Sequence, residues 1–203
     1  MIILGVTGKA DKRIITYPLL KMCTLAGKTA VLTDDTTYRR LYEGYDNQGY
    51  IDNVEINIVP ELCGENAEQI AQEYEERKRE ENFEYLIYIS DVYISKNADS
   101  ILALLEFNKT FLGWTIEELN ETNPCIIPCI ITSGKTDFNS KNDKNILNIV
   151  WKIPYFEYLI KTEERRHFIP SKDRIINRIL EKAFRKSLSL ELVNFKKLAK
   201  RSL

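Results

Sequence analysis

A glycine and three basic side chains follow the first apolar run of the chain, at the point where a helical pattern begins. Residues 2–6 are β-rich and are followed by Gly8 and Lys9, with Lys12 and Arg13 just beyond. In a β-loop-α unit the N-terminus of the helix attracts anions, because its backbone N–H groups are unpaired and its dipole is positive there. Lys9, Lys12 and Arg13 are therefore candidates for contacting phosphate groups.

The same loop lacks most of what nucleotide hydrolysis requires. A phosphate-binding loop uses several glycines, which let the backbone approach the oxygens closely, and then a lysine and a Ser or Thr. After Lys9 the chain reads ADKRIIT without a further glycine, and Asp11 adds a negative charge where phosphate would lie. Thr16 is the hydroxyl that remains. We expect hydrolysis at background and no catalytic residue, because the groups that neutralise a transferring phosphoryl are missing.

Acidic residues lie at the ends of two later apolar runs. Asp34 and Asp35 follow the second run, and Asp91 closes the run FEYLIYISD. In P-loop proteins an Asp at such a strand end orders magnesium. The ion would also need the Ser or Thr hydroxyl of a phosphate-binding loop, and residues 8–15 hold neither, so we expect no metal site. The alternative for Asp34 and Asp35 is a strand-end turn that caps the following segment.

A phosphoacceptor receiver domain is another interpretation of these acidic residues. It would use Asp34, Asp35 and Asp91 as the acidic pocket, with Thr132 as the hydroxyl and Lys135 as the lysine. In a receiver domain the acidic pair should follow the first strand, whereas here it follows the second. The motif therefore stands in the wrong structural context.

The order of apolar runs predicts the fold class. Six β-type runs alternate with helical patterns, which predicts an α/β fold with a mostly parallel sheet and helices on both faces. We expect a helix starting at Pro18, a second helix over 65–82 with the charged residues of 73–79 on its solvated side, and a third over 97–108. Strands are expected over 54–59, 126–132 and 146–153, and Pro128 predicts an edge or a bulge in the second of these. The Tyr-rich segment 36–53 is either a partner-binding surface or a segment that packs its rings on the domain.

The opening of the chain resembles that of ParA/MinD-type partitioning ATPases, whose deviant P-loop reads roughly GKGGxGK[ST][ST]. Gly8 and Lys9 match the first glycine and the signature lysine of that loop, and Thr16 matches its last position. The resemblance rests on short stretches between residues 1 and 170, including a late strand followed by Ile-Pro and a short helix.

This resemblance implies a P-loop NTPase-like fold with a degenerate loop, and it implies places for several residues. Asp34 or Asp35 would lie near the nucleotide and the attacking water, and Asp91 would be the Walker-B-like residue. The loop after residue 132 would supply the group that reads the base, for which the candidates are Lys135, Asp137 and Asn139.

Composition predicts one soluble domain without a charge-driven partner. The 203 residues are 44% hydrophobic and 29% charged, with a formal net charge of -1, which gives no whole-molecule reason to bind nucleic acid. Cys23, Cys63, Cys125 and Cys129 lack paired spacing and are expected to be free thiols, and with His167 as the single histidine no histidine metal cluster forms. We expect a cytoplasmic location, since no apolar run is long enough to span a bilayer and no signal-type leader is present.

The last part of the chain differs in charge from the rest. We divide the chain into an α/β domain, 1–170, and a basic helical extension, 171–203, in which residues 174–203 hold nine Lys or Arg against two Glu. Its first apolar stripe is expected to pack on the sheet. Its second suits either an anionic membrane surface, a partner's groove or the chain's own domain, and its contact residues would be Phe195, Lys196, Lys197, Lys200 and Arg201.

Two functions follow from these features. The first is a catalytically inactive ParA/MinD-like scaffold or positioning factor, without a cofactor, which binds protein partners in a bacterial machine for partitioning, conjugation, pilus assembly or secretion and forms a homodimer or a peripheral membrane contact. The alternative is an ATPase or nucleotide sensor that binds ATP and magnesium and uses Lys9, Lys12 and Arg13 on the phosphates.

Overall fold

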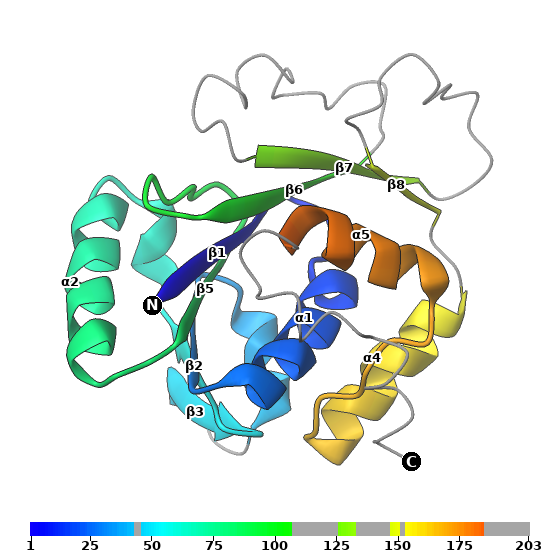
Figure 1. Cartoon of the computed structure of the whole chain (residues 1–203), viewed down its shortest axis with the longest axis horizontal. Coiled ribbons are helices and arrows are strands. Elements are labelled where there is room, and N and C mark those ends of the chain that lie inside the picture. Colours follow the sequence, from blue (N-terminus) through cyan, green and yellow to red (C-terminus); the bar gives the residue numbers. More distant parts are fainter. Residues whose placement is uncertain (43–45, 107–125, 133–146, 151–152, 185–203) are drawn as a thin grey trace.

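The computed structural model describes residues 1–42, 46–106, 126–132, 147–150 and 153–184. Within them lies an eight-stranded sheet of order β3-β4-β2-β5-β1-β6-β7-β8 (Figure 1). Neighbouring strands are parallel except for the antiparallel pair β3-β4, as expected for a mostly parallel sheet. The strands are β1 (Ile2–Thr7), β2 (Thr29–Thr33), β3 (Gln48–Ile51), β4 (Val54–Ile58), β5 (Tyr85–Ser90), β6 (Ser100–Glu106), β7 (Ile126–Thr132) and β8 (Leu147–Val150).

Helices cover both faces of the sheet, which confirms the predicted fold class. The helices are α1 (Arg13–Ala26), α2 (Ala67–Glu80), α4 (Ile153–Arg165), α5 (Arg174–Phe184) and the 3-10 turns η1 (Thr36–Leu41) and η2 (Pro60–Cys63). One core lies where α1, α4 and α5 pack on one face, and a second lies under α2 on the other (Figure 1). Alternate residues of each strand enter the two cores: Leu4 and Val6 of β1 face α1, whereas Ile3 faces α2.

The segment predicted as a third helix is a strand, and that prediction was wrong. Residues 100–106, SILALLE, form β6, which pairs in parallel with β1 so that Gly5 lies opposite Ile101. Its residues Ile101 to Leu104 are all buried, because helices cover both faces of the sheet. A strand buried on both faces carries a continuous apolar run, and periodicity cannot distinguish such a run from a buried helix.

Helix α1 begins earlier than predicted, and helix α2 has a different exposed side. Helix α1 starts at Arg13, so Pro18 lies inside it and not in its first turn. In α2 the charged side chains of Glu75 and Lys78, expected in solvent, are buried against the sheet. Both have polar partners there: Lys78 pairs with Glu55 at 2.7 Å, and Glu75 accepts a hydrogen bond from the Tyr88 hydroxyl at 2.9 Å. Polar partners on β4 and β5 thus allow these two charged residues to lie on the buried side of α2.

The structure also bears on the predictions made for Pro128 and for the Tyr-rich segment 36–53. Strand β7 lies between β6 and β8, but its pairing with β8 starts at Cys129, so Pro128 borders β6 alone in the described sheet. On its β8 side Pro128 thus has no paired residue in the described sheet, as the predicted edge position requires, whereas the pairing with β6 runs through Pro128 without a bulge. In the Tyr-rich segment, Tyr38 and Tyr42 are buried in the core and Tyr50 is exposed.

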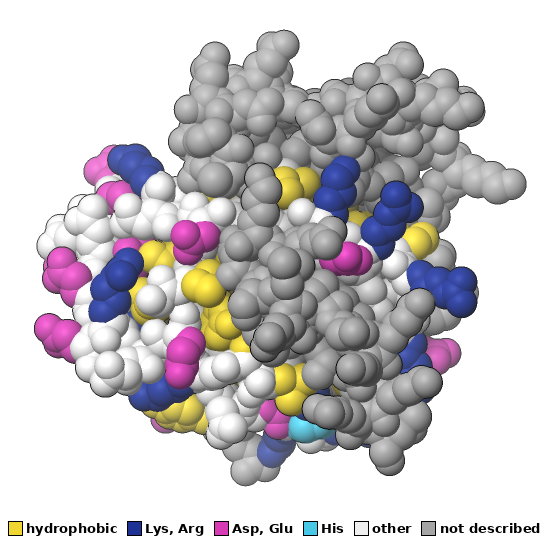
Figure 2. Space-filling view, viewed as in Figure 1, with side chains coloured by type: hydrophobic (Ala, Val, Ile, Leu, Met, Phe, Trp, Pro, Cys, Tyr) yellow, Lys and Arg dark blue, Asp and Glu magenta, His cyan; other side chains and the backbone are white. Residues whose placement is uncertain are grey.

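The first apolar stripe of the extension packs as expected. Helix α5 buries Ile176, Ile179, Leu180, Ala183 and Phe184 in the same core as α1. The basic residues 195–201 and the base-reading candidates 135–139 lie outside the described residues, so the extension as a separate unit remains a prediction. Among the helices that the model describes, none is both long and apolar enough to cross a bilayer. On the face in Figure 2, basic and acidic side chains are interspersed over the described surface.

Candidate functional site

A pocket lies where three neighbouring parallel strands end. Strands β2, β5 and β1 are adjacent in the sheet, and the residues that follow each of them line a cavity of about 760 Å³. That volume is within the range of about 300–1,000 Å³ typical of small-molecule sites, and the carboxyl edge of a parallel sheet is where such sites lie. The pocket is lined by Lys9, Ala10, Asp11, Lys12, Arg13, Asp34, Asp35, Thr36, Thr37, Pro60, Cys63, Asp91 and Val92.

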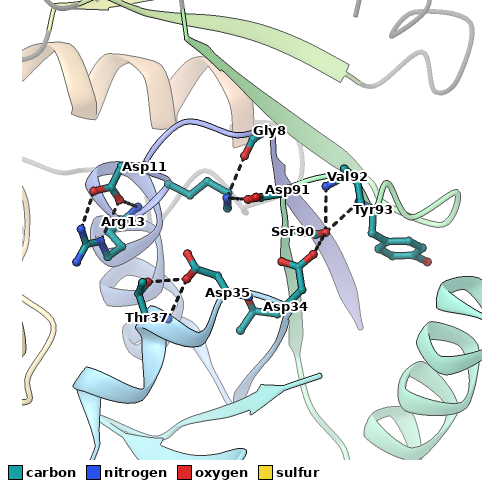
Figure 3. Close-up of polar contacts among 12 residues, drawn as sticks. Gly8, Asp11, Arg13, Asp34, Asp35, Thr37, Ser90, Asp91, Val92 and Tyr93 are labelled. Carbon is teal, nitrogen blue, oxygen red and sulfur yellow. Dashed lines mark hydrogen bonds and ion pairs between the residues drawn. The ribbon is translucent and has the colours of Figure 1, made fainter. Parts of the chain in front are cut away.

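The fold therefore brings together six of the eight predicted nucleotide-binding residues. Lys9, Lys12 and Arg13 come from the loop after β1, Asp34 and Asp35 from the end of β2, and Asp91 from the end of β5. Figure 3 shows the acidic side chains around this opening. They converge because the carboxyl ends of parallel strands meet at one edge of the sheet, although the residues are far apart in sequence.

Lys12 is the buried cation of the pocket. It precedes the first residue of α1, and its side chain is 3% exposed. Its ammonium Nζ donates to Oδ1 of Asp91 at 2.5 Å and to the carbonyl oxygen of Gly8 at 2.9 Å. The Asp91 side chain is 54% exposed, so the pair lies at the pocket wall with its cation inside and its carboxylate facing out. Asp91 thus has a cation supplied by the chain itself.

Asp11 occupies the N-terminus of α1. Its Oδ1 accepts hydrogen bonds from the backbone N–H of Arg13 at 3.1 Å and from Arg13 Nε at 3.0 Å, and its Oδ2 accepts from Nη2 at 2.7 Å. On the other side, Arg13 Nη1 donates to Oε1 of Glu163 in α4 at 2.8 Å, and the Tyr17 hydroxyl donates to the same oxygen. The hydrogen bond to Asp11 raises the pKa of Arg13 further above its usual range. A carboxylate of the chain therefore sits where a phosphate would meet the helix.

Asp34 and Asp35 have different environments. Asp35 Oδ1 accepts from the backbone N–H of Thr37 at 2.9 Å and from its hydroxyl at 2.7 Å, which confirms that Asp35 caps the turn η1. Asp34 accepts from the Ser90 hydroxyl at 2.5 Å and faces the pocket (Figure 3). Burial raises the pKa of Asp34, and the nearby Asp91 carboxylate adds to the rise despite the Ser90 hydrogen bond.

We expect Asp34→Asn to stabilise the protein at neutral pH. A raised folded-state pKa means that ionised Asp34 costs stability, and this cost is fully present above that pKa and disappears as pH falls below the usual value of 3.8. Urea unfolding of the two proteins should therefore differ at about pH 7 in favour of the variant and should converge near pH 3. The exposed Glu80→Gln is the matched control, with little change expected. A variant less stable at pH 7 would show that the Ser90 hydrogen bond to the carboxylate outweighs its burial.

Two of the predicted residues, Thr16 and Gly8, are not among the residues that line the pocket. The Thr16 hydroxyl is fully buried and hydrogen-bonded to the Tyr38 hydroxyl, away from the pocket lining. Gly8 contributes its carbonyl oxygen, and its backbone φ of 108° lies in the left-handed region. The three acidic residues of the receiver-domain interpretation, Asp34, Asp35 and Asp91, lie together in this pocket. Its other two residues are not tested, because the Thr132 side chain and Lys135 lie outside the described atoms.

Several residues in or beside the pocket were not among the predicted ones. Glu163 binds Arg13 from 150 residues away, and no local pattern indicates it. Cys63 and Pro60 come from η2, which follows β4. Ser90 could have been found, because it directly precedes Asp91 at the end of the same strand.

No family model matches the chain, and no curated protein matches it. Among solved structures, the MinD cell division protein of Aquifex aeolicus is similar with a TM-score of 0.55 at 13% identity, over 89% of this chain and 97% of that chain. The chain has a P-loop NTPase-like fold. A structure of molybdopterin-guanine biosynthesis protein B (mobB) is similar at a TM-score of 0.35 and 13% identity, over 81% of this chain and 97% of that chain, and we base no argument on it.

The residues at the MinD-like position do not fit a magnesium ion. Such a fold implies the ion beside the carboxylate at the end of β5 and a hydroxyl at the start of α1. Here the Asp91 carboxylate is paired with Lys12, Ile15 is a buried apolar side chain, and the Thr16 hydroxyl is bonded to Tyr38. Within the described residues no group of three His, Cys, Asp or Glu side chains is arranged to hold a metal.

Proposed function

We propose that this protein works without hydrolysing nucleotide, as a scaffold or positioning factor in a larger protein assembly. One observation carries the proposal: two of the cations at the start of α1 are bound to carboxylates of the chain, Lys12 to Asp91 and Arg13 to Asp11 and Glu163. A phosphoryl group in transfer needs free cations to neutralise its charge, and these cations are already neutralised. The chain thus combines a fold similar to that of the MinD structure with internal ion pairs at the loop where a phosphate would bind.

The existing ion pairs of Lys12 and Arg13 disfavour the binding of a phosphate in this pocket. A hydrogen bond to a charged group contributes about 1.5–3 kcal/mol, so a phosphate that takes Lys12 and Arg13 from their partners must offset several such bonds. It would also approach the carboxylates of Asp11, Asp34 and Asp91, which line the same pocket. The phosphate and these carboxylates are all negatively charged, so they would repel one another unless a cation lay between them.

The pocket itself supports the alternative, a nucleotide sensor. A cavity of about 760 Å³ with Lys9, Lys12 and Arg13 in its lining is large enough for a nucleotide. Asp91 is more than half exposed, so Lys12 would exchange that carboxylate for a phosphate oxygen at a smaller cost than in a fully buried pair. Under this alternative, nucleotide binding would release Asp91 and change the assembly state.

Calorimetric titration with ATP and ADP in the presence of magnesium tests the proposed function. We expect no heat at millimolar nucleotide, which corresponds to binding weaker than about -4 kcal/mol, and phosphate release equal to that of buffer. Light scattering should show the same mass with and without nucleotide. Micromolar binding that drives dimerisation would overturn the proposal in favour of the sensor. In that case Lys12→Ala and Arg13→Ala should abolish the heat, while Lys28→Ala, remote from the pocket lining, should not.

A further inference from the structure

The ion pair between Lys12 and Asp91 has a specific consequence for metal binding. The Lys12 ammonium donates hydrogen bonds to one carboxylate oxygen, Asp91 Oδ1, and to one carbonyl oxygen, that of Gly8. Carboxylate and carbonyl oxygens are also the ligands that hard divalent cations take in proteins. The Lys12 ammonium therefore uses the atoms that a metal ion at the end of β5 would need.

Burial makes the ammonium a fixed part of the site. The Lys12 side chain is 3% exposed, and its two acceptors come from the residue that follows β5 and from the loop after β1. Lys12 itself lies just before α1, so its side chain joins the start of the helix to the strand ends. Because the Lys12 side chain is buried and hydrogen-bonded, holding it in this position costs little additional conformational entropy. An exposed surface ion pair would lose more.

The neighbouring carboxylate is consistent with a cation at this point. Asp34 and Asp91 both line the pocket, and the Asp34 carboxylate accepts a hydrogen bond from Ser90, the residue that precedes Asp91. Two carboxylates near each other require a positive charge, which in P-loop folds is supplied in part by a bound divalent ion. Here the chain supplies it from position 12.

We propose that the Lys12 ammonium is the resident cation of this pocket and excludes divalent metal ions from Asp91. This inference deepens the proposed function, since it names what blocks the metal on which phosphoryl transfer depends. The pocket is metal-free as long as the Lys12 side chain lies against Asp91. Removing the ammonium while keeping the carboxylates converts the same place into a divalent-cation site.

Manganese binding to the full chain without nucleotide tests this inference. Mn²⁺ replaces magnesium as a paramagnetic probe, and free Mn²⁺ is read by electron paramagnetic resonance. Wild type should show no saturable binding below about 1 mM, whereas Lys12→Met, which keeps the length and removes the charge, should bind at least about tenfold more tightly, or 1.4 kcal/mol. Lys12→Arg keeps a cation and should behave as wild type. Adding Asp91→Asn to Lys12→Met should remove the gain.

The outcomes separate this inference from the proposed function. Mn²⁺ binding by wild type as tight as by Lys12→Met overturns it, and so does a folded Lys12→Met variant that gains nothing. If thermal unfolding shows that Lys12→Met is not folded, wild type and Asp91→Asn decide. If wild type and Asp91→Asn both bind negligible Mn²⁺, the inference is supported. If wild type binds Mn²⁺ and Asp91→Asn does not, the inference is overturned. The proposed function fails by a different measurement, nucleotide hydrolysis or nucleotide-driven dimerisation.

Discussion

Replacing Lys78 with alanine is expected to lower the free energy of unfolding by about 3–5 kcal/mol, because it leaves a buried carboxylate without its cation. The carboxylate is that of Glu55 in β4, which is 3% exposed and lies 2.7 Å from Lys78 Nζ. The Lys78 ammonium also lies over the rings of Phe83 and Tyr74, at 4.7 and 5.2 Å from their centroids. The ammonium also pairs with Glu81 at 2.7 Å, so alanine removes four interactions at once.

The pH dependence of the variant distinguishes the lost ion pair from lost packing. Burial raises the pKa of Glu55, but the hydrogen bonds from Lys78 and Asn57 outweigh it and hold the value below 4.5. A lowered pKa contributes stability that is present above the usual value and is lost as pH falls through the folded-state value. The difference between wild type and Lys78→Ala should therefore be largest at neutral pH and should narrow below about pH 4.5.

Urea unfolding of a set of variants measures this effect. Arg79→Ala, on the exposed side of α2, is the matched control and should change stability by less than about 0.5 kcal/mol. Glu55→Gln combined with Lys78→Met removes both charges and should recover much of the loss. A Lys78→Ala effect no larger than that of Arg79→Ala, or one independent of pH, would contradict the role assigned to the pair.

Replacing Gly8 with alanine is expected to destabilise the protein by about 2–6 kcal/mol, from left-handed backbone strain and from overpacking against β6. The backbone φ of Gly8 is 108°, and an added Cβ would lie 2.0 Å from the carbonyl oxygen of Leu104. Strand β6 or the loop must move to make room. Because the Gly8 carbonyl accepts a hydrogen bond from Lys12, that movement also disturbs the pocket.

Thermal and urea unfolding of Gly8→Ala and Gly64→Ala provide the comparison. At Gly64 the added Cβ would lie 3.2 Å from the carbonyl oxygen of Glu61, and no left-handed φ is involved. We expect that control to change stability by less than about 1 kcal/mol. Equal effects at the two positions would show that the loop after β1 adjusts freely, and that its first glycine is not required by the approach of β6.

The contacts of Lys78 with Glu55 and of Gly8 with β6 join residues that are far apart in the sequence, so no local pattern of residues indicates them. Glu75 and Lys78 belong to a run of charged residues in α2, and that composition predicts a solvated side. Their burial depends on polar partners on β4 and β5, which the chain order alone does not place beneath the helix. For the same reason β6 was predicted as a helix: its apolar run fits either structure until the two layers of helices are known.

The alternation of apolar runs and helical patterns was sufficient to predict the mostly parallel sheet and the helices on both faces, and it placed Asp34, Asp35 and Asp91 at the ends of apolar runs. Those features depend on period and chain order, which are local properties and topological rules. The tertiary structure alone decided which charges are paired. Lys12 meets Asp91 across 79 residues and Arg13 meets Glu163 across 150, because side chains bind whichever partner the packed elements bring within a few ångströms.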